Sequence, residues 1–64
     1  MEQLTLRAIR TNLGLSADEM AKKVGLKNGY QWYRRERYEK ELELSATVAL
    51  LNLTGLKFED IKLK

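Results

Sequence analysis

The sequence predicts an all-α protein built from five short helices. The chain has 64 residues, which is enough for one domain only, since domains run from about 50 residues upward. Between Gly14, Gly25 and Gly55, apolar residues recur at intervals of three and four, the spacing of helices that bury one face. No pair of segments alternates as two partner strands would, so no strand is expected.

The first helix is predicted over about residues 5–13. Its apolar residues Leu6, Ile9 and Leu13 share one face. Gly14 follows, and glycine readily adopts the left-handed conformation that ends a helix. The helix is therefore expected to stop at this point.

A second helix is predicted to begin after Ser16. Ser16 and Glu19 have the spacing of a capping box, in which each side chain accepts a hydrogen bond from the backbone amide of the other residue. Gly25 is expected to end the helix. Its inner face is predicted to carry Met20, Ala21 and Val24.

A third helix is predicted over about residues 28–36, and its centre is aromatic and basic. Trp32 is its best apolar anchor, interpreted as a core residue rather than one that stacks on a base. Propensity also permits a strand here, but the chain offers no partner strand. Residues 37–43 form a charged connection.

Two further helices are predicted after that connection. In the fourth, over about residues 44–55, the core-facing stripe is expected to be Leu44, Thr47, Val48 and Leu51. A short fifth helix is expected from the spacing of Leu56, Phe58 and Ile61.

The whole chain has a net charge of +3, and its positive charge is concentrated in one third of the sequence. Between residues 20 and 40 only Glu36 and Glu39 are acidic, whereas the basic residues are Lys22, Lys23, Lys27, Arg34, Arg35, Arg37 and Lys40. Clustered basic charge in a small domain indicates an anionic partner, most often nucleic acid; the alternative is a solvated helix face.

Several classes of function are disfavoured by what the sequence lacks. It has no cysteine and no histidine, so disulfides, the usual zinc ligand sets and Cys- or His-based catalysis are missing. No apolar run approaches the 18 residues of a membrane span, and the start lacks the basic region of a signal peptide. We therefore expect a cytoplasmic protein that is no enzyme and needs no metal, cofactor, small-molecule substrate or membrane.

The second and third helices, joined across Gly25, predict a helix-turn-helix over about residues 16–36 of a single domain, 1–64. Four segments in order, 6–10, 14–26, 34–36 and 54–61, make the chain similar to a known family. It resembles the phage Cro/repressor (XRE-type) helix-turn-helix domains, particularly small ones from phages of Gram-positive bacteria. The resemblance covers Leu4 to Leu63 and implies a compact five-helix, lambda-repressor-like fold.

The resemblance also implies roles for particular residues. Arg10 at the end of the first helix is expected to pair with Glu36 at the end of the third and to hold the recognition helix on the scaffold. Most relatives carry a phosphate-contacting glutamine where this chain has Ala17. This chain is also one residue longer before Glu36, with Asn28-Gly29 at the cap and first turn.

Candidate DNA contacts lie on and around the recognition helix, residues 28–36. Arg34 and Gln31 are expected to read bases, whereas the lysines are expected to supply charge. Asn28 is either a turn residue or an adenine contact, and the tyrosines are either base contacts or partly buried. The full candidate set is Ala17, Lys22, Lys27, Asn28, Tyr30, Gln31, Tyr33, Arg34, Arg37 and Lys40.

Leu50 and Leu53 lie off the predicted core stripe of the fourth helix. Either the first and fifth helices cover them, or they contact another protein. We expect them to form a weak homodimer or a contact with a partner repressor, helped by Leu42 or Leu63.

The leading hypothesis is a sequence-specific transcriptional regulator of Cro/repressor type. Its recognition helix would lie in the major groove of double-stranded DNA, at a near-palindromic operator. The alternative is a modulator, or antirepressor, that keeps the fold but binds another phage repressor. Ala17 and the apolar surplus on the fourth helix favour this alternative.

Overall fold

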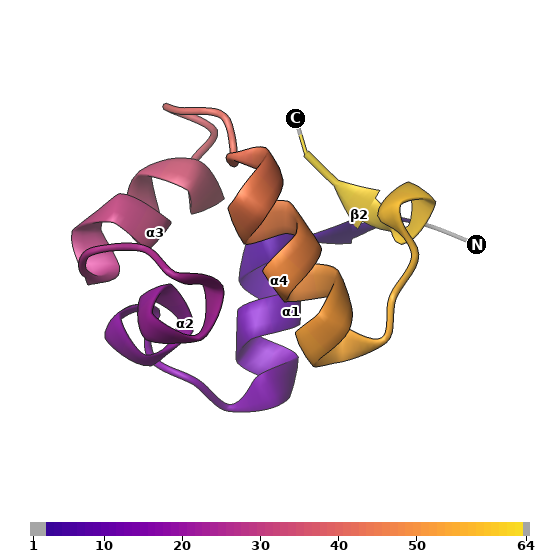
Figure 1. Ribbon diagram of the computed structural model, residues 1–64, viewed down its shortest axis with the longest axis horizontal. Helices are drawn as coiled ribbons and strands as arrows, with labels where there is room; N and C mark the ends of the chain where they lie inside the picture. Colours follow the sequence, from indigo (N-terminus) through magenta and orange to yellow (C-terminus); the bar gives the residue numbers. More distant parts are fainter. Residues whose placement is uncertain (1–2, 64) are drawn as a thin grey trace.

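The structure, a computed structural model, describes residues 3–63. Its four α-helices surround one core (Figure 1). They are α1 (Leu6–Leu13), α2 (Ala17–Val24), α3 (Gly29–Glu36) and α4 (Leu44–Thr54). The remaining elements are the 3₁₀ turn η1 (Phe58–Asp60) and the strands β1 (Leu4–Thr5) and β2 (Ile61–Lys62). The predicted all-α character is confirmed, since the described chain is mostly helical.

The helices α1 and α2 begin at side-chain caps and end at left-handed glycines. Thr5 caps α1 by accepting a hydrogen bond from the amide of Ala8 at 3.0 Å. Both hydrogen bonds of the predicted capping box are present at the start of α2. Gly25 then adopts φ of +82°, a left-handed conformation that glycine takes without steric cost, so α2 can turn sharply into α3.

The predicted fifth helix is wrong, as is the expectation that the chain has no strand. Residues 58–60 make a single 3₁₀ turn, and β2 then pairs in parallel with β1, with Leu4 opposite Ile61. This pairing buries Ile61 in an extended conformation. The partner lies at the other end of the sequence, so local apolar spacing carries no sign of it.

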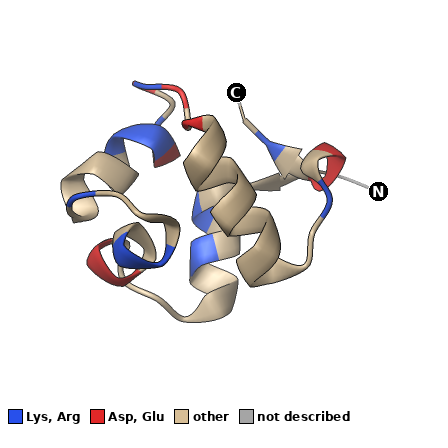
Figure 2. Cartoon of the chain, viewed as in Figure 1, with Lys and Arg blue, Asp and Glu red and all other residues tan. Residues whose placement is uncertain are grey.

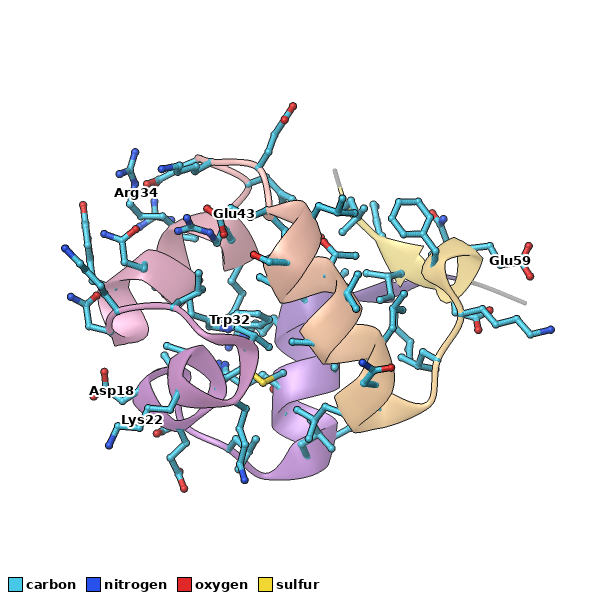
Figure 3. All side chains as sticks on the ribbon, in the orientation of Figure 1. Asp18, Lys22, Trp32, Arg34, Glu43 and Glu59 are labelled. Atoms are coloured by element: carbon cyan, nitrogen blue, oxygen red, sulfur yellow. The ribbon has the colours of Figure 1, made fainter. Side chains whose placement is uncertain are left out.

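One residue from α3 lies at the centre of the core. Trp32 is completely buried, which confirms the prediction that it is a core residue, and Figure 3 shows it among the helices. The buried apolar residues are Leu6, Ile9, Met20, Ala21, Val24, Trp32, Ala46, Leu50 and Ile61. Every helix contributes to this single cluster, so α2 and α3 are fixed to one body.

The face that α4 turns to the core overlaps only in part with the predicted one: Thr47 is buried as predicted, and Leu51 packs half-buried against the core. Leu44 is 79% exposed and Val48 is 49% exposed, although both were expected to be core residues. Leu50 is 0% exposed, so its assignment to a protein contact is wrong, whereas Leu53 is exposed. Small Ala46 is buried beside Leu50.

The reason for this difference is that apolar residues occur all round α4. Its sequence offers two possible apolar faces, so periodicity does not select one of them. The buried face carries the small residues Ala46 and Thr47, which let the helix approach α2 closely. The hydroxyl of Thr47 donates a hydrogen bond to the carbonyl of Glu43 at 2.9 Å, so its burial leaves no unpaired donor.

Candidate nucleic-acid interface

The solvent-facing side of α3 carries two tyrosines and two arginines. This α3 outer face consists of Tyr30, Tyr33, Arg34 and Arg37. Because Trp32 points into the core, the residues on the opposite side of α3 point outward. Tyr30 is 64% exposed, and Arg34, although half-buried, extends its guanidinium away from the body of the molecule (Figure 3).

Within the α3 outer face, an aromatic ring and a cation are already paired. The guanidinium carbon of Arg37 lies 5.3 Å from the centre of the Tyr33 ring, within the range of a cation–π interaction. Arg37 Nη1 lies 3.4 Å from the Tyr33 hydroxyl, and Arg37 Nε lies 3.3 Å from Glu39 Oε2. These contacts hold the Arg37 side chain along the helix rather than free in solvent.

The end of α3 is tied to α1 through Glu36. Arg10 donates two hydrogen bonds to this carboxylate, from Nε at 2.9 Å and from Nη2 at 3.2 Å. Trp32 Nε1 donates a third, at 2.7 Å. The two residues that the family resemblance pairs are therefore in bidentate contact, and the same carboxylate also positions the core tryptophan.

The environment of Glu36 favours its charged form. Burial alone would raise the pKa of this carboxyl, but the hydrogen bonds from Arg10 and Trp32 outweigh it and leave the pKa below its ordinary value. The same hydrogen bond raises the pKa of Arg10. The pair is thus fully ionised at neutral pH.

The start of α3 is tied to α2, and this explains the Asn28-Gly29 pair. Asn28 is the N-cap, its side-chain oxygen accepting a hydrogen bond from the amide of Gln31 at 3.0 Å. The amide of Gly29 donates to Asp18 Oδ1 at 2.7 Å. A Cβ on Gly29 would lie only 2.9 Å from the backbone nitrogen of Asp18, so this approach requires glycine. The cap engages the Asn28 oxygen, which was a candidate for contacting adenine.

Arg35 is a structural residue that the sequence reasoning missed. It is buried and pairs with Glu43, the residue before α4. It also donates to Gln31 Oε1 at 3.1 Å. The hydrogen bonds that Arg35 donates to Glu43 lower the pKa of the Glu43 carboxyl. The signal was present in the sequence, since Arg35 lies three residues after Trp32 and so shares its inward stripe.

Gln31, predicted to read bases, does not lie on the α3 outer face. Its side chain is half-buried, and its oxygen accepts the hydrogen bond from Arg35. It faces instead a hollow between the helix-turn-helix and the start of α4, lined by Leu26, Glu43 and neighbouring residues. Of the two predicted base readers, Arg34 alone points outward on α3.

The N-terminus of α2 is acidic. Ala17 is half-buried and packs against the core, and the amides of Ser16 and Glu19 are engaged in the capping box. Asp18 and Glu19 place two exposed carboxylates there. The backbone and side-chain hydrogen bonds from Ser16 lower the pKa of Glu19, so its charge persists at neutral pH. These charges disfavour a phosphate at this position.

The predicted lysine contacts are all exposed. Lys22 projects from α2 beside Asp18 (Figure 3), Lys27 lies in the turn before α3, and Lys40 lies in the connection after it. Figure 2 shows that Lys and Arg recur along the helix-turn-helix and α1. The lysines lie around α3 without being held in one geometry, which suits charge attraction rather than specific contact.

Beside the α3 outer face lies a basic hollow of about 420 Å³, lined by Arg7, Arg10, Tyr33, Glu36 and Arg37. It holds three guanidinium groups and one carboxylate, and we call it the arginine hollow. Arg7 was not among the predicted site residues, although it lies one turn before Arg10. Two of the three arginines, Arg7 and Arg37, are exposed, and arginine geometry suits phosphate oxygens.

Comparisons of this chain with protein-family models, with curated proteins and with solved structures find no match. In the part of the chain that the structure describes, no helix is long and apolar enough to cross a membrane.

Proposed function

We propose that this chain is a sequence-specific DNA-binding transcriptional regulator of Cro/repressor type. The observation that carries the proposal is the α3 outer face, where two exposed tyrosines and two arginines lie on a helix fixed at both ends. A short helix with this composition fits the major groove, where arginine contacts guanine and tyrosine packs against bases or phosphates.

Each part of the site has its own task in this proposal. Arg34 reads a base, because it points away from the molecule and is not tied to a carboxylate of residues 3–63. Tyr30 and Tyr33 contact bases or the sugar–phosphate backbone. The arginine hollow and the surrounding lysines bind phosphates and make the affinity depend on salt.

Because the start of α2 is acidic, the proposed phosphate contacts lie at the arginine hollow instead. In the usual arrangement a phosphate lies at the positive end of such a helix, but Asp18 and Glu19 occupy that end here. The arginine hollow at the far end of α3 offers the compensating charge. The recognition helix is thus proposed to be anchored to the DNA backbone near its C-terminus.

The proposal is tested by titrating the protein against the intergenic DNA beside its own gene and against random DNA, at two salt concentrations. We expect nanomolar affinity for the intergenic DNA, weaker binding to random DNA, and a steep loss of affinity as salt increases. Replacing Lys22 by Ala should weaken binding to both DNAs alike. Equal affinity for the two DNAs would contradict the proposal.

A second candidate is a modulator that keeps this fold and binds another repressor protein. Two observations favour it: the carboxylates of Asp18 and Glu19 at the position where relatives contact a phosphate, and Ala17 in place of their glutamine. Equal affinity for intergenic and random DNA, together with a stable complex with a repressor protein, would support this candidate instead.

A further inference from the structure

The exposed side of α4 carries no charged residue. From residue 44 to residue 56 the chain carries no Lys, Arg, Asp or Glu, and Figure 2 shows α4 without a coloured segment between its ends. Its solvent side displays Leu44 and Val48 together with Ser45 and Asn52, all of them exposed. These four residues, together with half-buried Leu51 at their edge, make up what we call the α4 open face.

The described part of the chain leaves this face uncovered. Residues 58–62, part of which was predicted to form a fifth helix, make η1 and β2 instead, and β2 pairs with β1 beside α1 (Figure 1). Leu44, at the start of α4, is 79% exposed. Small domains seldom display contiguous apolar residues unless another molecule covers them.

We propose that the α4 open face packs against the same face of a second copy, with the two helices antiparallel about a twofold axis. This inference goes beyond DNA binding and does not rest on it. Its first support is charge. Each copy carries a net charge of +3, so two copies repel each other, and the repulsion is weakest where they meet through an uncharged helix.

The second support is that the face is self-complementary. At about 100° per residue, Leu51 and Leu44 lie along one edge, Val48 at the centre, and Ser45 and Asn52 along the other edge. A twofold axis through Val48 places Leu44 beside Leu51 of the second copy, about 1.5 Å apart along the helix axis. It places Ser45 beside Asn52 of the second copy at the same offset. Apolar residues thus meet apolar ones, and hydroxyl meets amide.

The size of this contact predicts a weak dimer. Eleven residues make a helix about 16 Å long and 10 Å wide, and such a face buries much less than the roughly 800 Å² per partner of a stable interface. The two copies would therefore associate mainly at high concentration, or when two neighbouring half-sites on DNA bring them together.

Disulfide cross-linking tests this arrangement directly, because the chain has no cysteine. Val48→Cys places a single thiol on the proposed twofold axis, and Phe58→Cys places one at an exposed apolar position on η1 as the control. Without DNA and at high protein concentration, we expect Val48→Cys to form disulfide-linked dimer at least about tenfold faster than Phe58→Cys. Equal rates would overturn the proposal.

A mixture of Ser45→Cys and Asn52→Cys proteins tests the register. We expect the mixed disulfide to exceed the homodimer of either variant, because only unlike positions are adjacent in the antiparallel pair. Homodimers in excess would overturn the antiparallel arrangement. The thiols lie on the surface and circular dichroism checks the fold, so a failed cross-link is not a failure to fold, and neither result depends on DNA binding.

Discussion

α3 and α4 are fixed to the same core by different forces. α3 has directional polar ties at both ends: the amide of Gly29 donates to Asp18 at its start, and Glu36 binds Arg10 at its end. α4 contains no charged residue, and apart from the ion pair between Arg35 and Glu43, the residue before its start, it is held by burial, with Leu50 completely inside the core. Directional contacts at both ends restrict the orientation of α3, whereas α4 has such a contact at its start only.

The largest effect should come from removing the core anchor of either helix. Trp32→Ala in α3 should lower the free energy of unfolding by about 3–5 kcal/mol, and Leu50→Ala in α4 by about 2–5 kcal/mol, because each leaves a cavity in a small core. Urea denaturation measures both. A loss below about 1 kcal/mol for Leu50→Ala would mean that α4 is not held by burial.

A smaller loss should follow from breaking a polar tie of α3. Glu36→Gln should cost about 2 kcal/mol, since it leaves the charge of Arg10 uncompensated next to the core. The matched control is Glu39→Gln, which removes only an exposed partner of Arg37 and should cost less than about 1 kcal/mol. Equal losses in the two variants, measured by thermal unfolding, would contradict the directional account of α3.

The polar ties also make the stability of α3 dependent on pH. The pKa values of Glu36 and Glu43 are lowered in the folded protein. Their stabilisation is therefore fully present above the ordinary carboxyl pKa of about 4.5, and it is lost as the pH falls through the lower folded values. Thermal unfolding from pH 7 to pH 3 should show a smaller loss in Glu36→Gln than in the unmodified chain. If both proteins lose the same stability between pH 7 and pH 3, Glu36 does not contribute to the pH dependence of stability.

The smallest effect is expected on the α4 open face. Leu44→Gln should change the free energy of unfolding of the isolated monomer by no more than about 0.5 kcal/mol, because the side chain contacts little of the core. Urea denaturation at low protein concentration measures this change. A loss comparable to that of Leu50→Ala would place Leu44 in the core after all.

The same contrast explains which features could be predicted from the sequence. The bounds of α2 follow from Ser16, Glu19 and Gly25, because caps and left-handed glycines are local signals. Trp32 was predicted correctly as a core residue because polar residues surround it, so only one phase of α3 suits the interior. In α4 no such contrast exists: Thr47 is buried as predicted, but the rest of the buried face is formed by Ala46 and Leu50 instead of Leu44 and Val48.

The rest of the fold and site depended on contacts between distant residues. The pairing of Leu4 with Ile61 replaces a helix by a strand, and no window of sequence contains both residues. Gln31 was predicted to face DNA, but Arg35 engages its oxygen on the other side of α3. In the sequence, Asn28-Gly29 is typical of an ordinary turn. The need for glycine at position 29 follows only from its contact with Asp18, which lies on another helix.

In the proposed function, the α3 outer face reads DNA sequence through Arg34. The most direct measurement compares Arg34→Ala with Lys57→Ala, which removes the same charge from an exposed position next to η1. We predict that Arg34→Ala lowers affinity for the cognate DNA by about 1–3 kcal/mol and relaxes discrimination at one base pair. We predict that Lys57→Ala leaves the ratio of cognate to random affinity unchanged. Equal losses on cognate and random DNA for Arg34→Ala would contradict the claim.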